Sequence, residues 1–496
     1  MSSSSLRSSG LNILTRIIEH PHGGQPGRLK AIGSRVLAYA ESVTDKPAVP
    51  AAMTRSRDYV SIVFLFLMAL LSAHEADAQF RASVVTRDIT PHDAQMLLGY
   101  QERKSAGVHD RIMHRIAAMD DGVTQFFLVS SDICEISPSL YDEVAAQLQE
   151  RFGISPLSFW WTVTHTHSAP EVGSPGLDAV FLGERYQHKI DSVYTAFVVR
   201  ELIEGIGEAR DRLTPARIGA GWGFSQANIN RRGIDVDGNA SLGLNPDGAV
   251  DRRIGLIRIQ DAGGKQLGLI ANYPIHGTVL GPQNLEISGD APGIVSHYVE
   301  EQTGAPMLFI NGAAGNLAPI YSVYPDPGAG HLGQFRVLLG DRILDANRSI
   351  KETTAAVKLY AGALTVETPR KEGLGWASDI GEYSRTTASG VNMIRLPLRF
   401  LRINDDIAIW SAPLELFCEI SNTIRDRSPF PYTFYFGYGN GWLGYLPTSA
   451  EWEHGGYEVE DASPYTPSAE KDLTEAVVGY LQGEMKSAHA GKRNIR

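Results

Sequence analysis

The chain is poor in cysteine and in clustered positive charge, and both absences exclude classes of function. Only two cysteines, Cys134 and Cys418, occur among 496 residues, and no CxxC spacing is present. Zinc sites built from cysteine thiolates are therefore excluded. Lysine and arginine, 45 together, are outnumbered by 56 acidic residues and form no basic stripe, so no nucleic-acid partner is expected.

Cys134 follows a strand-like apolar run, and Cys418 lies in an apolar helix-like run. Two buried free thiols are the favoured interpretation, although an exported protein would permit a disulfide between them. A phosphate-binding loop is also missing, because the glycine-rich stretch Gly312 to Gly315 is not followed by Gly-Lys-Ser/Thr.

No apolar run is long enough to span a membrane comfortably. The longest candidate, Tyr59 to Leu71, has 13 residues, where about 20 are needed. It follows Arg55 and Arg57 and precedes Ala76-Asp77-Ala78, which is the pattern of a signal peptide with a small-residue cleavage site. An uncleaved membrane anchor is the competing interpretation.

We therefore expect a signal peptide over residues 53–78, preceded by a non-structural segment over 1–52, and a secreted or periplasmic protein that begins at Gln79. One catalytic domain is expected over residues 79–485 and a polar tail over 486–496. Its apolar runs alternate between strand-like and helix-like patterns, which predicts an α/β fold with a mixed sheet covered by helices on both faces. The strand-like runs are 125–129, 159–163, 254–259, 268–273, 307–310, 357–366 and 407–410, and the helix-like runs include 140–152, 187–209 and 294–302.

Two histidine motifs follow predicted strands. His165 and His167 form an H-x-H motif after the aromatic run 157–163, and His276 follows the apolar run 267–273. Ligands collect at strand ends in open α/β sheets, and neutral imidazoles with one carboxylate suit zinc. Taken alone, the H-x-H motif is equally consistent with two histidines bonded to backbone groups in a loop.

Several short segments, in one order, resemble the catalytic domain of the neutral/alkaline non-lysosomal ceramidases, from about Ser83 to about Pro467. They include Asp88-Ile89-Thr90-Pro91, Leu98-Gly99-Tyr100, Gly107 to Arg111, Ser131-Asp132-Ile133, Thr164 to Pro170, Asn228 to Arg231, Tyr273 to Gly277, Asn311 to Pro319, Ala412 to Glu415, Gly437 to Asn440, Gly444 to Thr448 and Tyr457-Glu458. The resemblance implies a zinc amidase that cleaves an N-acyl bond.

The resemblance places the zinc ligands on His165, His276, Glu415 and Tyr445. A tyrosine ligand is unusual, and a core tyrosine is the alternative for Tyr445. The same resemblance places His167, Arg231 and Tyr457 around the substrate carbonyl, where a cation and a phenol suit a developing oxyanion; Arg231 could instead form a surface ion pair. It also places four residues of its motifs in contact with substrate: Gly99, His109, Asn316 and Ala318.

One departure from the family concerns the nucleophile. Ceramidases carry a serine where this chain has Ala318, and an alanine methyl group can neither attack nor donate a proton. Ser322 lies beyond Pro319 and is not expected to reach the same point. A water molecule activated by zinc is then the simplest nucleophile, with Asp290 or His167 as base. A helix N-cap is the alternative role for Asp290.

A second departure is length, because the ceramidases continue into a C-terminal β-sandwich domain that we do not expect in this chain. The favoured function is a zinc-dependent amide hydrolase acting on a small-molecule, lipid-derived or glycan-derived substrate, without a stable membrane span. A hydrolase of an ester, lactone or glycosidic bond is the first alternative, and a catalytically silent metal-binding protein is the second.

Overall fold

The structure, a computed structural model, describes residues 79–320 and 331–493. The predicted signal peptide, the segment before it and Ser322 lie outside the described residues.

The larger of two main sheets has eight strands in the order β14-β12-β11-β8-β1-β5-β6-β7. Most neighbours are antiparallel, but the edge pairs β6/β7 and β12/β14 are parallel. Its strands are β1 (Arg81–Asp88), β5 (Met113–Asp120), β6 (Gln125–Ser131), β7 (Phe159–Val163), β8 (Thr214–Phe224), β11 (Arg253–Asp261), β12 (Gln266–Tyr273) and β14 (Met307–Asn311).

The second main sheet has the order β16-β18-β19-β21, with β17 added beside β18. The pair β19/β21 is parallel. Its strands are β16 (Leu359–Pro369), β17 (Ser384–Thr386), β18 (Asn392–Ile403), β19 (Ile407–Ser411) and β21 (Tyr432–Phe436).

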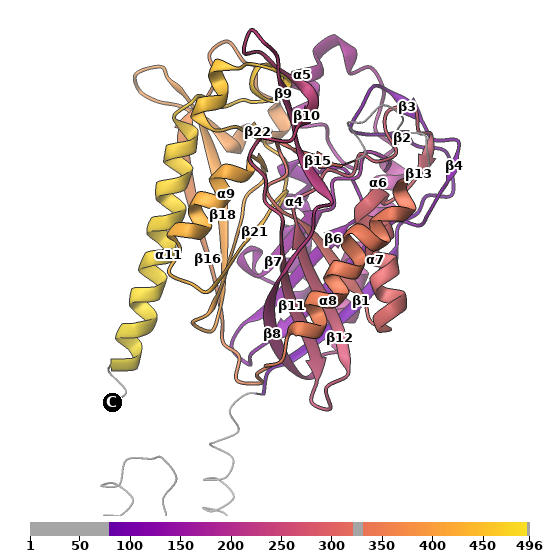
Figure 1. Ribbon diagram of the computed structural model, residues 1–496, viewed down its shortest axis with the longest axis vertical. Coiled ribbons are helices and arrows are strands. Elements are labelled where there is room, and N and C mark those ends of the chain that lie inside the picture. Colours follow the sequence, from indigo (N-terminus) through magenta and orange to yellow (C-terminus); the bar gives the residue numbers. More distant parts are fainter. Residues whose placement is uncertain (1–78, 321–330, 494–496) are drawn as a thin grey trace, which may run out of the picture. The chain divides into compact units, whose positions relative to one another are not determined.

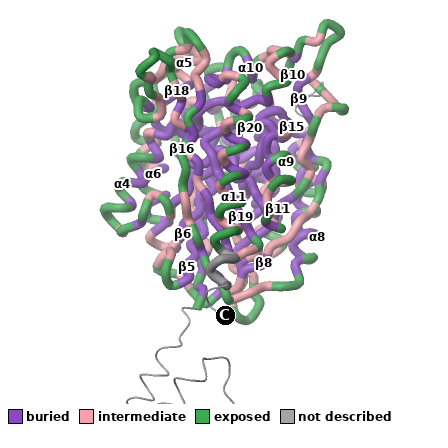
Figure 2. The backbone as a smooth tube through the Cα atoms, turned by 90° about the vertical axis from the view of Figure 1, so that its left-hand side faces the viewer, coloured by how far each residue is buried: buried purple, intermediate pink, exposed green. Residues whose placement is uncertain are grey.

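The two sheets face each other across an apolar core. Leu128, Trp160 and Ile270 from the larger sheet share one buried cluster with Leu401 and Phe434 from the smaller one. Such alternation of inward-facing apolar residues from two stacked sheets forms a sandwich core. The smoothed backbone in Figure 2 shows this buried interior between more exposed outer elements.

Helices cover the outer face of each sheet (Figure 1). On the larger sheet α6 packs on β1 and β5, α7 on β14, and α8 on β8 and β11. On the smaller sheet α11 packs on β16 and also contacts α9. The helices are α4 (Pro138–Phe152), α5 (Asp178–Leu182), α6 (Ser192–Asp211), α7 (Asp290–Thr303), α8 (Asp341–Ser349), α9 (Cys418–Arg427), α10 (Tyr457–Glu460) and α11 (Ala469–Arg493). The predicted α/β fold with a mixed sheet and covering helices is confirmed, but each main sheet carries helices on one face only and packs on the other sheet with its second face.

Local sequence signals explain where helices begin and end. The side chain of Ser137 accepts a hydrogen bond from the Ser139 amide at the start of α4, Pro138 occupies the first turn, and Gly153 ends the helix in the left-handed conformation. Asp191 caps α6 in the same way through the amides of Val193 and Tyr194. Helix α11 runs to Arg493, so the predicted start of the polar tail at residue 486 falls inside a helix.

Short strands connect the loops at one end of the molecule. They are β2 (Met96–Leu97), β3 (Arg103–Lys104), β4 (Gly107–Val108), β9 (Asn228–Ile234), β10 (Ala240–Asn245), β13 (Glu286–Ile287), β15 (Leu317–Pro319), β20 (Glu415–Leu416) and β22 (Tyr445–Leu446). They pair as β10-β9-β15, β13-β4, β2-β3 and β20-β22. The loops after β7, β12, β14, β19 and β21 all contribute to the site described next.

Two further expectations bear on packing and on membranes. Cys134 and Cys418 are both buried and free, as the interpretation of two buried thiols required. Within the described ranges, none of the helices combines the length and apolar character needed to cross a bilayer.

Candidate metal centre

The H-x-H loop is held in a strained, fixed shape directly after β7. His165 has φ of 61°, a left-handed conformation that a non-glycine residue adopts at a cost and that often marks a functional position. Its amide donates to the Ile133 carbonyl, which anchors the turn to the neighbouring chain segment.

Gly277 joins this loop to the second histidine segment. Thr166 and Gly277 form a parallel bridge, in which the Gly277 amide donates to the His165 carbonyl and the His167 amide donates to the Gly277 carbonyl, at 3.1 and 2.9 Å. A Cβ at Gly277 would lie 2.6 Å from Thr166 Cα, so only glycine permits this approach. Backbone contacts therefore set the spacing of His165 and His276.

Both proposed histidine ligands have their ring orientation fixed by a backbone carbonyl. His165 Nδ1 lies 2.9 Å from the Cys134 carbonyl oxygen, and His276 Nδ1 lies 2.8 Å from that of Leu317. Each Nδ1 must carry the proton to donate there, so in the neutral ring each Nε2 presents a lone pair. This is how metal-binding histidines are usually oriented by their surroundings.

Glu415 reaches the same point from the other sheet. It follows β19 in β20, whose register pairs Glu415 directly with Tyr445 of β22. Its Oε2 accepts a hydrogen bond from the Tyr438 hydroxyl at 3.2 Å, and its Oε1 accepts one from Trp442 Nε1 at 3.0 Å. Tyr438 also stacks on the His165 ring, with centroids 4.3 Å apart.

The three groups converge on one another. Glu415 Oε2 lies 3.2 Å from His165 Nε2 and 3.0 Å from His276 Nε2, and all three residues are buried. Two lone pairs and a carboxylate facing one another repel unless a cation lies between them, so this donor set fits a metal ion. Tyr445 is next to them, with its hydroxyl oxygen 3.3 Å from His276 Nε2.

The protonation states agree with this arrangement. Burial and the nearby charge of Arg231 lower the pKa of His276 to about 4, which leaves the ring neutral at physiological pH. Neutral imidazoles and an ionised carboxylate are the forms that bind metals.

Arg231 and His167 lie beside the three donors. Arg231 Nη2 donates to the Tyr445 oxygen at 3.0 Å, and the residue is buried. His167 Nε2 lies 3.1 Å from His165 Nε2, and its Nδ1 is buried with no hydrogen-bond partner. Burial, with His165 and His276 close by, lowers the pKa of His167 well below its usual range.

Tyr457 forms the outer part of the same group. Its ring meets the Tyr445 ring edge to face, with centroids 5.8 Å apart, and the residue is 47% exposed. It is therefore placed between the buried donors and solvent, where it can touch a bound molecule.

Asp290 is engaged by backbone groups. Its carboxylate accepts hydrogen bonds from the amides of Val279, Leu280 and Ala291, at 3.0, 3.0 and 2.6 Å. Burial raises its pKa to about 6, against the effect of these amides. Asp290 is the first residue of α7 and holds the loop that follows His276, while Gly289 occupies the N-cap position.

The residues predicted to contact substrate lie in different surroundings. Gly99, with φ of +98°, faces His167, and a Cβ there would lie 2.4 Å from His167 Cγ. Ala318 is buried in β15 and follows Leu317, whose carbonyl orients His276.

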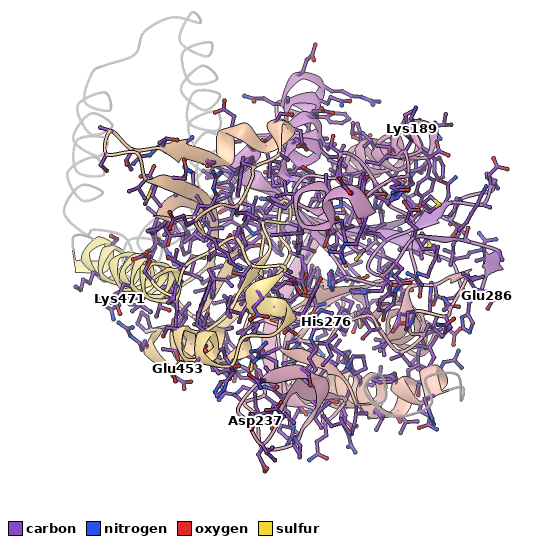
Figure 3. The ribbon with its side chains drawn as sticks, turned by 90° about the horizontal axis from the view of Figure 1, so that it is seen from above. Lys189, Asp237, His276, Glu286, Glu453 and Lys471 are labelled. Atoms are coloured by element: carbon purple, nitrogen blue, oxygen red, sulfur yellow. The ribbon has the colours of Figure 1, made fainter. Side chains whose placement is uncertain are left out.

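Asn316 and His109 are bound to other parts of the chain. The Asn316 side chain accepts from the Cys418 amide and donates to Glu419. His109 Nδ1 lies 2.7 Å from Asp110 beside β4, whose partner strand β13 contains Glu286. Figure 3 shows Glu286 at the periphery, whereas His276 lies near the centre.

Sequence reasoning missed several groups that support the centre. Tyr438 belongs to one of the family motifs and Trp442 to none of them, and both donate to Glu415. Beside Trp442 a small pocket is lined by three carboxylates, from Glu135, Glu171 and Asp178. These residues lie in apolar or irregular stretches, where single sequences carry no signal for them.

Taken together, two histidines and a glutamate at strand ends of an α/β fold define a candidate metal centre. Residues 80–313 match the family model of the neutral/alkaline non-lysosomal ceramidase N-terminal domain. The matched residues are just under half of the chain, and over this range the chain is similar to that family. The matched range contains His165, Arg231 and His276 but ends before Ala318, Glu415, Tyr445 and Tyr457.

Curated relatives match this chain over only part of their length. The neutral ceramidase of Pseudomonas aeruginosa is 28% identical over 293 residues, which are 56% of this chain and 42% of that protein. Neutral ceramidase B of Dictyostelium discoideum is 27% identical over 240 residues, covering 46% of this chain and 33% of that protein. The matches thus span less than half of each relative.

The fold is shared with a solved structure. The crystal structure of the Pseudomonas aeruginosa neutral ceramidase superposes with a TM-score of 0.65, covering 81% of this chain and 74% of that one, at 20% identity. A structure described as a ceramidase complexed with C2 gives the same TM-score at 18% identity.

Proposed function

We propose that this chain is an exported zinc-dependent hydrolase that cleaves an amide, N-acyl, bond. The observation that carries the proposal is the convergence of two oriented imidazole Nε2 atoms on the buried carboxylate of Glu415. Nitrogen and oxygen donors of this kind suit zinc, and the Tyr445 oxygen beside them is the fourth candidate ligand.

A zinc ion in this position would polarise the scissile carbonyl and activate a water molecule. Arg231 and Tyr457 would donate to the negative charge that develops on the carbonyl oxygen. His167, whose ring is neutral and whose Nδ1 has no partner, would accept the proton. Asp290 keeps a positioning role, because its oxygens are already bonded to backbone amides.

The relatives named neutral ceramidases support a lipid-derived N-acyl substrate. Ala318 favours a second candidate, hydrolysis of an ester, lactone or glycosidic bond. A buried alanine offers no side-chain nucleophile, and attack by water needs less assistance when the leaving group is more activated.

The test is a screen of zinc-loaded protein against panels of N-acyl amides, esters, lactones and glycosides, with His276→Ala as the metal-site control. Turnover of amides that is absent from the control supports the first candidate. Turnover confined to esters, lactones or glycosides supports the second, and no turnover of any panel by protein that binds one zinc contradicts both.

Export is the remaining part of the proposal, and it rests on the basic start, short apolar run and Ala-x-Ala site within residues 53–78. N-terminal sequencing of protein recovered outside the cytoplasm of the native host should begin near Gln79. A chain that still starts at Met1 in the membrane fraction would contradict it.

A further inference from the structure

Glu458 joins two arginines beside the candidate metal centre. Its Oε1 accepts from Arg231 Nε at 2.9 Å, and its Oε2 accepts from Arg232 Nη1 at 2.7 Å. All three side chains are almost completely buried. Arg232 has two further partners, Glu451 at 2.7 Å and the Gly455 carbonyl at 2.7 Å, whereas Arg231 has no second carboxylate among the described residues.

The two arginines differ in what their free ends contact. Arg232 points to Glu451 and Gly455, both in the segment that precedes α10. Arg231 Nη2 donates instead to the Tyr445 oxygen, which lies 3.3 Å from His276 Nε2. A guanidinium group is planar and rigid, so holding Nε in place also fixes the direction of Nη2.

We propose that Glu458 is a positioning residue of this centre: by holding Arg231 Nε, it directs Arg231 Nη2 to the Tyr445 oxygen and so keeps that oxygen turned toward the histidine and glutamate ligands. The inference rests on the proposed function for its role in catalysis, but its geometry involves only residues of this chain. Tyr457, the residue before Glu458, enters the site on the same short helix, α10.

The first measurement is zinc affinity, determined by titration against a competing chelator. Glu458→Gln should weaken zinc binding about 10-fold or more, the usual range for residues that orient a metal ligand being about 10 to 100-fold. Glu451→Gln is the matched control, because Glu451 contacts Arg232 and its side chain is 22% exposed. The control should bind zinc within about twofold of the wild-type protein.

A double-mutant cycle separates positioning from general stabilisation. If Glu458 acts through Arg231, Glu458→Gln should cause no further loss of affinity in an Arg231→Gln background. If Glu458 only anchors Arg232, Arg232→Gln alone should weaken zinc binding as much as Glu458→Gln does. Additive losses in the cycle, or equal losses in those two single variants, would overturn the proposal.

Removing one buried carboxylate leaves two guanidinium groups short of a partner, which can prevent folding. The Arg232→Gln/Glu458→Gln double variant removes one charge of each sign and restores the balance. It should fold, by thermal unfolding, and still bind zinc about 10-fold more weakly. Wild-type affinity in that folded variant would contradict the proposal.

Kinetics on any substrate found in the panels give the second readout. Glu458→Gln should lower kcat with little change in KM, because Arg231 acts on charge that develops during the reaction. Non-additive zinc affinities without turnover of any substrate would support the positioning role and refute the proposed function. Turnover with additive affinities would do the opposite.

Discussion

His276 Nε2 and Glu415 Oε2 lie 3.0 Å apart, although the two residues follow strands of different sheets. His276 is turned to this position by the Leu317 carbonyl, and Glu415 by the hydroxyl of Tyr438 and the indole of Trp442. Groups that are not candidate ligands therefore hold this pair in position. Two of the four candidate ligands are thus oriented before a metal ion binds.

Each purified chain should bind one zinc ion tightly. His165→Ala and His276→Ala should each reduce the zinc content, measured by elemental analysis, to well below one equivalent, since each removes one of three converging donors. His109→Ala is the control, because that ring is 40% exposed and bonded to Asp110. A full equivalent of zinc in both ligand variants would show that the ion binds elsewhere.

Arg231→Ala should lower kcat by roughly 10²–10³, the usual cost of losing a donor to a developing oxyanion. Arg212→Ala is suited as control, since this arginine is 67% exposed and paired only with Glu208 among the described residues. Initial rates at saturating substrate are the measurement, and unchanged turnover in Arg231→Ala would mean that its guanidinium does not act on the reacting carbonyl.

Ala318→Ser should raise the rate little, by about threefold at most, if water is the nucleophile. Position 318 lies in β15, paired with Ile229 of β9, so an added hydroxyl group would enter a buried strand. The same rate assay applies. A large gain would show that the site still supports a serine nucleophile.

Gly99→Ala should lower the reaction rate more than a glycine-to-alanine change at another position with positive φ. The new methyl group would lie 2.4 Å from His167 Cγ and force the ring to move, and misplacement of about 1 Å can cost about 10²-fold in rate. Gly153→Ala, also at positive φ but with open space around it, is the control for backbone strain. Equal rates in the two variants would argue against a role for the His167 position.

Protonation of His114 should destabilise the fold at acid pH. This residue is distant in sequence from the candidate ligands. Its Nε2 lies 3.1 Å from the Val198 carbonyl oxygen, and burial lowers its pKa to about 4, whereas the unfolded chain should have about 6.5. The unfolded state therefore binds more protons between these values, so this contribution to stability is present above pH 6.5 and is lost as the pH falls toward 4.

Between pH 7.5 and 4.5 the free energy of unfolding should fall in both proteins. The fall should be smaller in the His114→Gln variant than in the wild-type protein, by about 2 to 3 kcal/mol. Urea denaturation of both proteins at the two pH values measures this difference, and the histidines common to both cancel in the comparison. Equal losses would mean that His114 is not neutral in the fold.

Several strands were predictable because their signals are local. The run Phe159–Val163 coincides with β7, and runs at 254–259, 268–273 and 407–410 lie inside β11, β12 and β19. Their β-branched and aromatic residues are buried on both faces, so hydrophobicity alone marks them.

Long-range relationships could not be predicted. Tyr438 has φ of 53° and donates to Glu415, and Asn440, with φ of 63°, bonds to Trp161 through its side chain. Both were visible only as parts of Gly437 to Asn440, since pairing across two sheets leaves no periodic pattern in the chain. The stacking of two sheets, instead of one sheet between helix layers, escaped prediction for the same reason.

The stacked sheets also change what metal removal would do. Two candidate ligands follow strands of the eight-stranded sheet and two follow strands of the smaller one. An ion bound by all four would act as a crosslink between the halves of the sandwich, closing a loop of chain from residue 165 to residue 445. Chelation should therefore lower the unfolding temperature of the whole domain, so that metal loading becomes a measure of whether the two halves have assembled correctly.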